Sequence, residues 1–160
     1  MRSEFELIAE SYLAAKQESF TQNPTAEFIR SDASKAVRTA LGDLENGLEV
    51  KSSPGKGRWS DSPWIAILDP LVTQTPQKGY YVVYLFSSSM DHLVLTLALG
   101  VTDIKNNMPV NKAKNHLRHI AEVIRLRMPE HSNPEFGFSS DEIQLGGAGP
   151  LNRAMISSDR

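Results

Sequence analysis

The hydrophobic positions at the start of the chain recur with a helical period. Phe5, Ile8, Ala9 and Tyr12 follow the spacing i, i+3, i+4 and i+7, and charged residues fill other positions of the same stretch. Apolar residues at this spacing share one face of a helix. The pattern therefore predicts an amphipathic first helix that ends near Phe20.

A second helical stretch begins after Asn23. Asparagine is a preferred helix N-cap, and the proline that follows it suits the first helical position. The apolar spacing behind it is interrupted near residues 31–32. We expect one kinked helix or two short ones, with an apolar face made of Phe28, Val37 and Leu41.

From residue 48 the pattern changes to that of strands. Residues 48–51 alternate, residues 64–68 form a buried-type apolar run, and residues 80–86 are rich in aromatic and β-branched side chains. A short polar link over residues 87–91 leads into the apolar run 92–101, which suits an antiparallel hairpin better than a helical crossover. The centre of the chain is therefore predicted to be a β-meander.

A third helical pattern runs from Asn111 to Met128 and stops at Pro129. Its expected core face consists of Leu117, Ile120, Ala121, Ile124 and Met128. Further on, residues 136–139 and 143–145 read as short strands. The predicted fold is α+β, with a curved, mainly antiparallel sheet over about residues 48–102 and short strands near residues 136–145, flanked by helices.

Composition limits the organisation and the class of protein. A chain of 160 residues, 40% of them hydrophobic, favours one domain over residues 1–150, with residues 151–160 as the start of a linker or a truncated tail. The chain has no cysteine, no signal peptide and no run of about 20 apolar residues, which favours a cytoplasmic protein without a membrane partner. Because the net charge is -2, any DNA binding must come from a local patch.

The chain lacks several common motifs of enzymes. It contains neither a phosphate-binding loop nor a nucleophile elbow. His116 and His119 lie three apart on the third predicted helix, but without a third ligand a solvated basic face is the favoured interpretation. We expect no catalytic residue, no metal site and no cofactor.

One enzymatic alternative stays open. Asp43, Glu49 and Lys51 superficially match the carboxylates and lysine of many metal-dependent nucleases. In this interpretation the carboxylates would bind a metal ion beside the lysine. Chance alone makes such a match common in a chain rich in glutamate and lysine, so this hypothesis ranks below a binding function.

The segment from Ser52 to Trp59 has the composition of a phosphate contact. It joins small hydroxyl groups and two flexible glycines to two cations and an aromatic ring. Taken alone, these residues favour an ordinary solvated hairpin turn. The candidates for contacting a DNA backbone, or for filling the gap left by a displaced base, are Ser52, Ser53, Lys56, Arg58 and Trp59.

Four short motifs in a fixed order change this assessment. They are Gly55-Lys56-Gly57, Pro63-Trp64, Gly79-Tyr80-Tyr81 and Gly100-Val101-Thr102-Asp103. Over about fifty residues they resemble the N-terminal DNA-recognition domain of McrB-like modification-dependent restriction proteins. The resemblance implies a non-enzymatic module of an antiviral defence system that binds double-stranded DNA at a modified cytosine, 5-methylcytosine being the first choice. A GTPase or translocase, or a nuclease, is then expected on another domain or subunit.

The resemblance also implies a mechanism, in which the modified base is flipped out of the duplex into an aromatic pocket. It carries over to Trp64, Tyr81 and Leu85, and more roughly to Phe136. Strand alternation independently puts Tyr81 and Leu85 on one face. Between the two glycines the family can have an aromatic residue, whereas this chain has Lys56. The residue that fills the gap left by the flipped base, and the identity of that base, therefore stay open. A protein-interaction domain with exposed aromatic residues is the remaining alternative.

Overall fold

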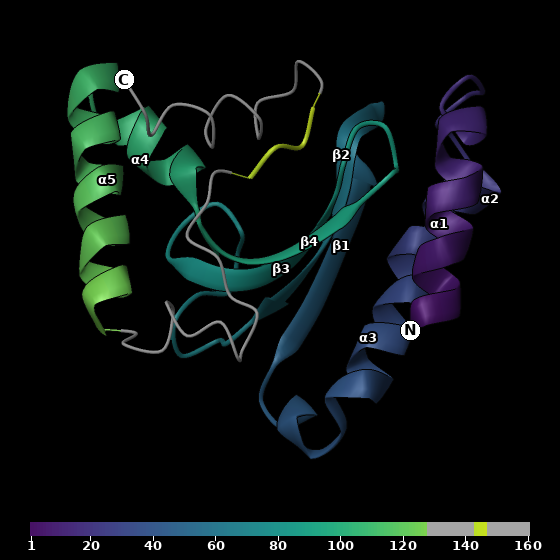
Figure 1. Ribbon diagram of the computed structural model, residues 1–160, viewed down its shortest axis with the longest axis horizontal. Helices are drawn as coiled ribbons and strands as arrows, with labels where there is room; N and C mark the ends of the chain where they lie inside the picture. Colours follow the sequence, from purple (N-terminus) through teal and green to yellow (C-terminus); the bar gives the residue numbers. More distant parts are fainter. Residues whose placement is uncertain (128–142, 147–160) are drawn as a thin grey trace.

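The computed structural model describes residues 1–127 and 143–146 (Figure 1). The first helix buries its predicted apolar residues Phe5, Ile8 and Tyr12, and it ends at Ala15 rather than near Phe20. The helical elements of this part of the chain are α1 (Arg2–Ala15), α2 (Pro24–Phe28), η1 (Ile29–Ala33), α3 (Ser34–Leu41), η2 (Gly42–Glu45), α4 (Val101–Asn107) and α5 (Val110–Arg127).

The second helical stretch has the predicted cap and the predicted interruption. The Asn23 side chain accepts a hydrogen bond of 2.9 Å from the Thr25 amide, and Pro24 is the first helical residue. The helix then widens into the π-helical turn η1 and continues as α3. Because η1 shifts the helical phase, Ala26, Ile29 and Val37 all lie buried.

The predicted meander is a four-stranded antiparallel sheet in the order β1-β2-β3-β4, which confirms the α+β fold. The strand runs predicted at residues 48–51 and 64–68 are the far ends of one long hairpin. The strands are β1 (Glu49–Gly55), β2 (Trp59–Leu68), β3 (Tyr80–Phe86) and β4 (Leu93–Leu99).

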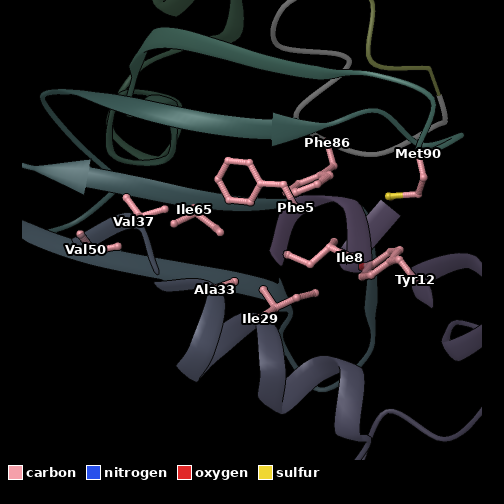
Figure 2. Close-up of a cluster of buried hydrophobic side chains, with 10 residues drawn as sticks. All are labelled: Phe5, Ile8, Tyr12, Ile29, Ala33, Val37, Val50, Ile65, Phe86 and Met90. Atoms are coloured by element: carbon pink, nitrogen blue, oxygen red, sulfur yellow. The ribbon is translucent and has the colours of Figure 1, made fainter. Parts of the chain in front are cut away.

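The sheet carries a hydrophobic cluster on each of its faces. On the first face, α1, η1 and α3 pack against the strands, and the ring of Phe5 meets that of Phe86 with centroids 5.7 Å apart (Figure 2). The Phe5 ring also lies 5.0 Å from that of Tyr84. The second face has its own cluster, in which Ala66 and Leu85 are buried with Leu145. Strand alternation thus separates β2 and β3 into two sets of core residues.

Two predicted strand segments need correction. The run expected to continue to residue 101 ends at Leu99, and residues 101–107 form α4. The Gly100 amide donates a hydrogen bond of 2.8 Å to the Gly79 carbonyl, just before β3 begins at Tyr80. The Asp103 amide then bonds at 3.0 Å to the Gln77 carbonyl, outside the ladder, where the chain has already turned into α4. Residues 143–145 are not a strand, and residues 136–139 lie outside the described residues.

Helices α4 and α5 lie on the opposite side of the sheet from α1 (Figure 1). The predicted third helix is confirmed as α5, which begins one residue before Asn111 and is described as far as Arg127. None of the helices in the described residues combines the length and apolar character needed to cross a membrane.

Candidate nucleic-acid interface

The hairpin of β1 and β2 ends in a tight turn built on two glycines. Gly55 and Gly57 have φ angles of 138° and 72°, values that side-chain-bearing residues rarely adopt. Strand β2 pairs with β3 only from Trp64 to Ile67. The end of the hairpin, with this turn, therefore projects beyond the edge of the β2–β3 pairing.

Helix α1 braces the projecting end from the first face. The Tyr12 hydroxyl lies 2.8 Å from the carbonyl oxygens of both Pro54 and Ser60 and shares its hydrogen between these two acceptors. Because burial raises the pKa of Tyr12 well above its ordinary value, the hydroxyl remains a donor. Lys16 adds an ion pair to Asp61 at 2.6 Å. Both arms of the hairpin are thereby fixed to one helix.

Trp59 belongs to this brace. Its indole Nε1 donates a hydrogen bond of 3.1 Å to the Glu18 carbonyl. Its ring meets Tyr12 and Phe20 edge to face, with centroid separations of 5.2 and 5.1 Å. Leaving this position would break all three contacts, so the structure positions Trp59 to hold the turn.

The two cations of the turn, unlike Trp59, are not engaged by the rest of the described structure. Lys56 and Arg58 are exposed, and among the residues that the structure describes neither has a hydrogen-bond or ion-pair partner. The hydroxyl groups of the β1 serines are engaged within the protein. Ser52 donates to the Ile29 carbonyl at 2.9 Å, and Ser53 donates to the Gly55 carbonyl at 3.2 Å. Of the five predicted backbone contacts, Lys56 and Arg58 are thus the ones free to meet a phosphate.

Trp64, Tyr81 and Leu85 share the second face of the sheet, with Tyr81 just beyond the opposite end of the β2–β3 pairing from the other two. Trp64 and Leu85 are directly opposite one another on β2 and β3. Trp64 and Tyr81 are half-buried around the cluster to which the buried Leu85 belongs. Burial raises the pKa of Tyr81, so its phenol stays neutral. Phe136 lies outside the described residues.

A short segment of the C-terminal region crosses this face. We call residues 143–146 the strap, and Figure 1 shows it in yellow on the side of the sheet away from α1. Leu145 is 1% exposed within the cluster that holds Leu85, and Ile143 packs at its margin. The Ser88 amide donates a hydrogen bond of 2.7 Å to the Leu145 carbonyl.

The residues of the nuclease hypothesis do not form a metal site in the described structure. Glu49 pairs with Lys51 at 3.0 Å, and Asp43 is exposed in η2, outside the sheet. No group of three metal-ligating side chains occurs within residues 1–127 and 143–146. His116 and His119 are exposed on α5.

A braced turn with two unpaired cations beside an aromatic sheet face defines an α+β module suited to bind nucleic acid. The family model described as the MrcB-like N-terminal domain matches residues 7–155. The chain therefore belongs to the MrcB-like N-terminal domain family, as the four motifs predicted. This membership assigns it to the DNA-binding domains of restriction proteins. Searches of curated proteins and of solved structures gave no match.

Two residues of this region have roles that their sequence patterns do not predict. The spacing of Tyr12 predicts only an apolar helix face, although its hydroxyl holds the turn. The pattern at Leu145 predicts a short strand, although its side chain packs into the cluster on the second face. The first carried a signal, since a tyrosine on an apolar face needs a partner for its hydroxyl. The second depends on long-range packing that no local pattern encodes.

Proposed function

We propose that this domain binds double-stranded DNA that carries a modified cytosine, with 5-methylcytosine as the first choice, and holds the flipped base on the second face of its sheet. The observation that supports this proposal is that Trp64, Tyr81 and Leu85 share one face of the sheet, with Trp64 and Leu85 at the end of the β2–β3 pairing nearest the braced turn. Membership of the MrcB-like N-terminal domain family supports DNA as the ligand. As a specificity domain, it would direct a GTPase, translocase or nuclease on another domain or subunit.

The pocket residues suit a methylated pyrimidine. The half-buried rings of Trp64 and Tyr81 can stack on a base, which is worth about 1–3 kcal/mol per base. Leu85, directly opposite Trp64 on the neighbouring strand, adds a buried apolar side chain to this site. Only a base outside the duplex presents its faces and its methyl group to such a site together. Phe136 remains a further proposed member of the pocket.

The backbone contacts follow from exposure. Lys56 and Arg58 hold phosphates, while Trp59 keeps the turn in place through its contacts with α1. Arg58 is the better candidate to fill the gap in the duplex, since its planar guanidinium group can stack on bases and the ammonium group of Lys56 cannot. Ser52 and Ser53 support the turn from within.

The function is tested by competition binding with matched duplexes that carry cytosine, 5-methylcytosine, 5-hydroxymethylcytosine or N6-methyladenine at one position. We expect the 5-methylcytosine duplex to compete best. An added fluorescence assay with 2-aminopurine beside the modified position would report loss of stacking. Equal competition by modified and unmodified duplexes would contradict the proposal.

The roles of the turn cations give a separate prediction. Lys56→Ala and Arg58→Ala should weaken binding to modified and plain duplexes alike. Each should reduce the slope of log affinity against log salt by about 0.9 per lost phosphate contact. The measurement is a salt titration of both duplexes. Lys35→Ala, which removes an exposed lysine from α3, is the matched control. If the turn variants lost affinity only for modified DNA, the assigned roles would be reversed.

A further inference from the structure

Strand β4 forms an edge of the sheet. It pairs with β3 on one side, and no other strand in the described part of the chain pairs with it. The Ser87 amide bonds to the His92 carbonyl at 3.0 Å, and the Gly100 amide bonds to the Gly79 carbonyl at 2.8 Å. Because backbone direction alternates along an antiparallel strand, the even-numbered residues of 92–100 direct their amides and carbonyls to β3.

The odd-numbered residues of β4 consequently direct their backbone groups to the open edge. They include Leu93, Leu95 and Leu97. Within residues 1–127 and 143–146, the amides and carbonyls of these three leucines have one side-chain contact, a long one of 3.5 Å from the Thr96 hydroxyl to the Leu97 carbonyl oxygen. A row of unpaired amides and carbonyls on an edge strand is a template for pairing with another strand.

The side chains of the same leucines form an open apolar surface. Leu93, Leu95 and Leu97 lie on the first face and are 36%, 51% and 38% exposed. Val82, opposite Leu97 on β3, is 36% exposed and continues the surface. Helix α1 packs against Tyr84 of β3 and leaves the leucines of β4 uncovered. Contiguous exposed apolar surface of this kind marks an interaction site.

The opposite edge of the sheet is protected against such pairing. Strand β1 carries the charged residues Glu49 and Lys51, and Pro54 lies near its end. From α3, the Arg38 guanidinium group donates a hydrogen bond of 3.0 Å to the Val50 carbonyl. Charges, proline and a covering helix are the features by which proteins prevent edge-to-edge association. The sequence of β4, LVLTLAL, has no charge and no proline.

We propose that β4 pairs with β4 of a second copy of this chain, antiparallel about a two-fold axis at Leu95. Leu95 then lies opposite Leu95 of the second copy, and Leu93 lies opposite Leu97. The outward amides and carbonyls of these residues exchange hydrogen bonds across the axis. A two-fold axis perpendicular to the sheet keeps the same face of both copies together. The leucine side chains therefore meet in one continuous apolar stripe.

The chemistry of the edge favours a second copy over other partners. Its backbone groups require an extended strand, and its leucines require apolar side chains on alternate residues of that strand. Strand β4 itself meets both requirements, and it places no like charges opposite one another. Nucleic acid does not fit, since β4 offers no cation to a phosphate. A seven-residue strand makes a small interface, so we expect a reversible dimer with a dissociation constant on the order of micromolar or weaker.

Sedimentation of the 160-residue chain over a wide range of concentrations tests the dimer. Leu95→Lys and Leu95→Glu should each raise the dissociation constant about tenfold or more, because apolar contact is lost and like charges face each other. An equal mixture of the two variants should associate again, since opposite charges then meet. Leu71→Lys, at a 96% exposed leucine after β2, is the matched control and should dimerise like the wild type.

The dimer and the proposed function can fail separately, because the leucines of β4 and the proposed base pocket lie on opposite faces of the sheet. A wild type that stays monomeric at every concentration would overturn the dimer. Equal loss of association in Leu71→Lys would overturn its assignment to β4. A mixture of the two Leu95 variants that stays monomeric would overturn the pairing at this residue.

Hydrogen exchange distinguishes strand pairing from simple stacking of leucine surfaces. The amides of Leu93, Leu95 and Leu97 should be protected where the dimer forms and exchange freely on dilution. The amides of Val94 and Thr96, which face β3, should be protected under both conditions. Free exchange of the outward amides in a dimer would overturn edge pairing. Their protection in a protein that sediments as a monomer would place another part of the same chain on the edge and overturn the second copy.

Discussion

Replacing Trp64 with alanine is expected to remove most of the preference for modified DNA and to leave binding to unmodified duplex nearly unchanged. The indole is half-buried on the second face, directly across from Leu85, where it can stack on a flipped base. Loss of one base-stacking ring costs about 1–3 kcal/mol, or about five- to 150-fold in affinity. Unmodified duplex, held through its phosphates by Lys56 and Arg58, does not use this ring.

The effect of Trp64 on recognition must be separated from its effect on packing. Trp64→Phe keeps an aromatic face and should restore much of the discrimination. Ile67→Ala is the matched control, because Ile67 lies on the same strand but packs into the cluster on the face that α1 covers. Both variants are compared by thermal unfolding and by competition between modified and plain duplexes. If Ile67→Ala reduced discrimination as much as Trp64→Ala, a general loss of stability would explain both results.

Local patterns in the sequence predicted the elements that depend on neighbouring residues. The Asn23 cap works through the amide two residues later, so it is visible in the sequence. The same holds for Tyr81 and Leu85, because side chains four positions apart on a strand share a face by geometry alone. What alternation could not decide was which face would be covered by α1, η1 and α3. That depends on how α1 packs against Tyr84 and Phe86.

The contacts that position the site join residues far apart in the chain. Trp59 bonds to Glu18, 41 residues earlier, and Tyr12 bonds to Pro54, 42 residues later. No periodicity encodes such pairs, and for this reason Trp59 could not be separated from Arg58 as a candidate for the gap. Similarly, α4 could not be foreseen from residues 101–103, because the end of the ladder is set by where β3 begins.

Alanine at Gly55 is expected to be far more damaging than alanine at Gly57, although both glycines have positive φ angles. A Cβ at Gly55 would lie 2.0 Å from the Arg58 carbonyl oxygen and 2.8 Å from the Ser60 nitrogen, and these backbone atoms cannot turn aside. The strained φ of 138° and the clash together should cost roughly 2–6 kcal/mol of unfolding free energy. At Gly57 nothing lies within 4 Å of the new atom. The cost there is the left-handed backbone alone, about 1–2 kcal/mol.

The two variants therefore separate the shape of the turn from its flexibility. Chemical denaturation gives their unfolding free energies, and a salt titration of DNA binding shows whether Lys56 and Arg58 still reach phosphates. Gly57→Ala should retain most of the affinity, because the ladder pair Gly55–Trp59 and the anchor of Trp59 on α1 are preserved. Gly55→Ala must open that pair, which moves both cations at once and should lower affinity for every duplex. Equal losses of stability in the two variants would contradict this prediction, because they would show that the turn can accommodate a side chain at Gly55. The contacts with Tyr12 would then hold the hairpin end less firmly than we infer.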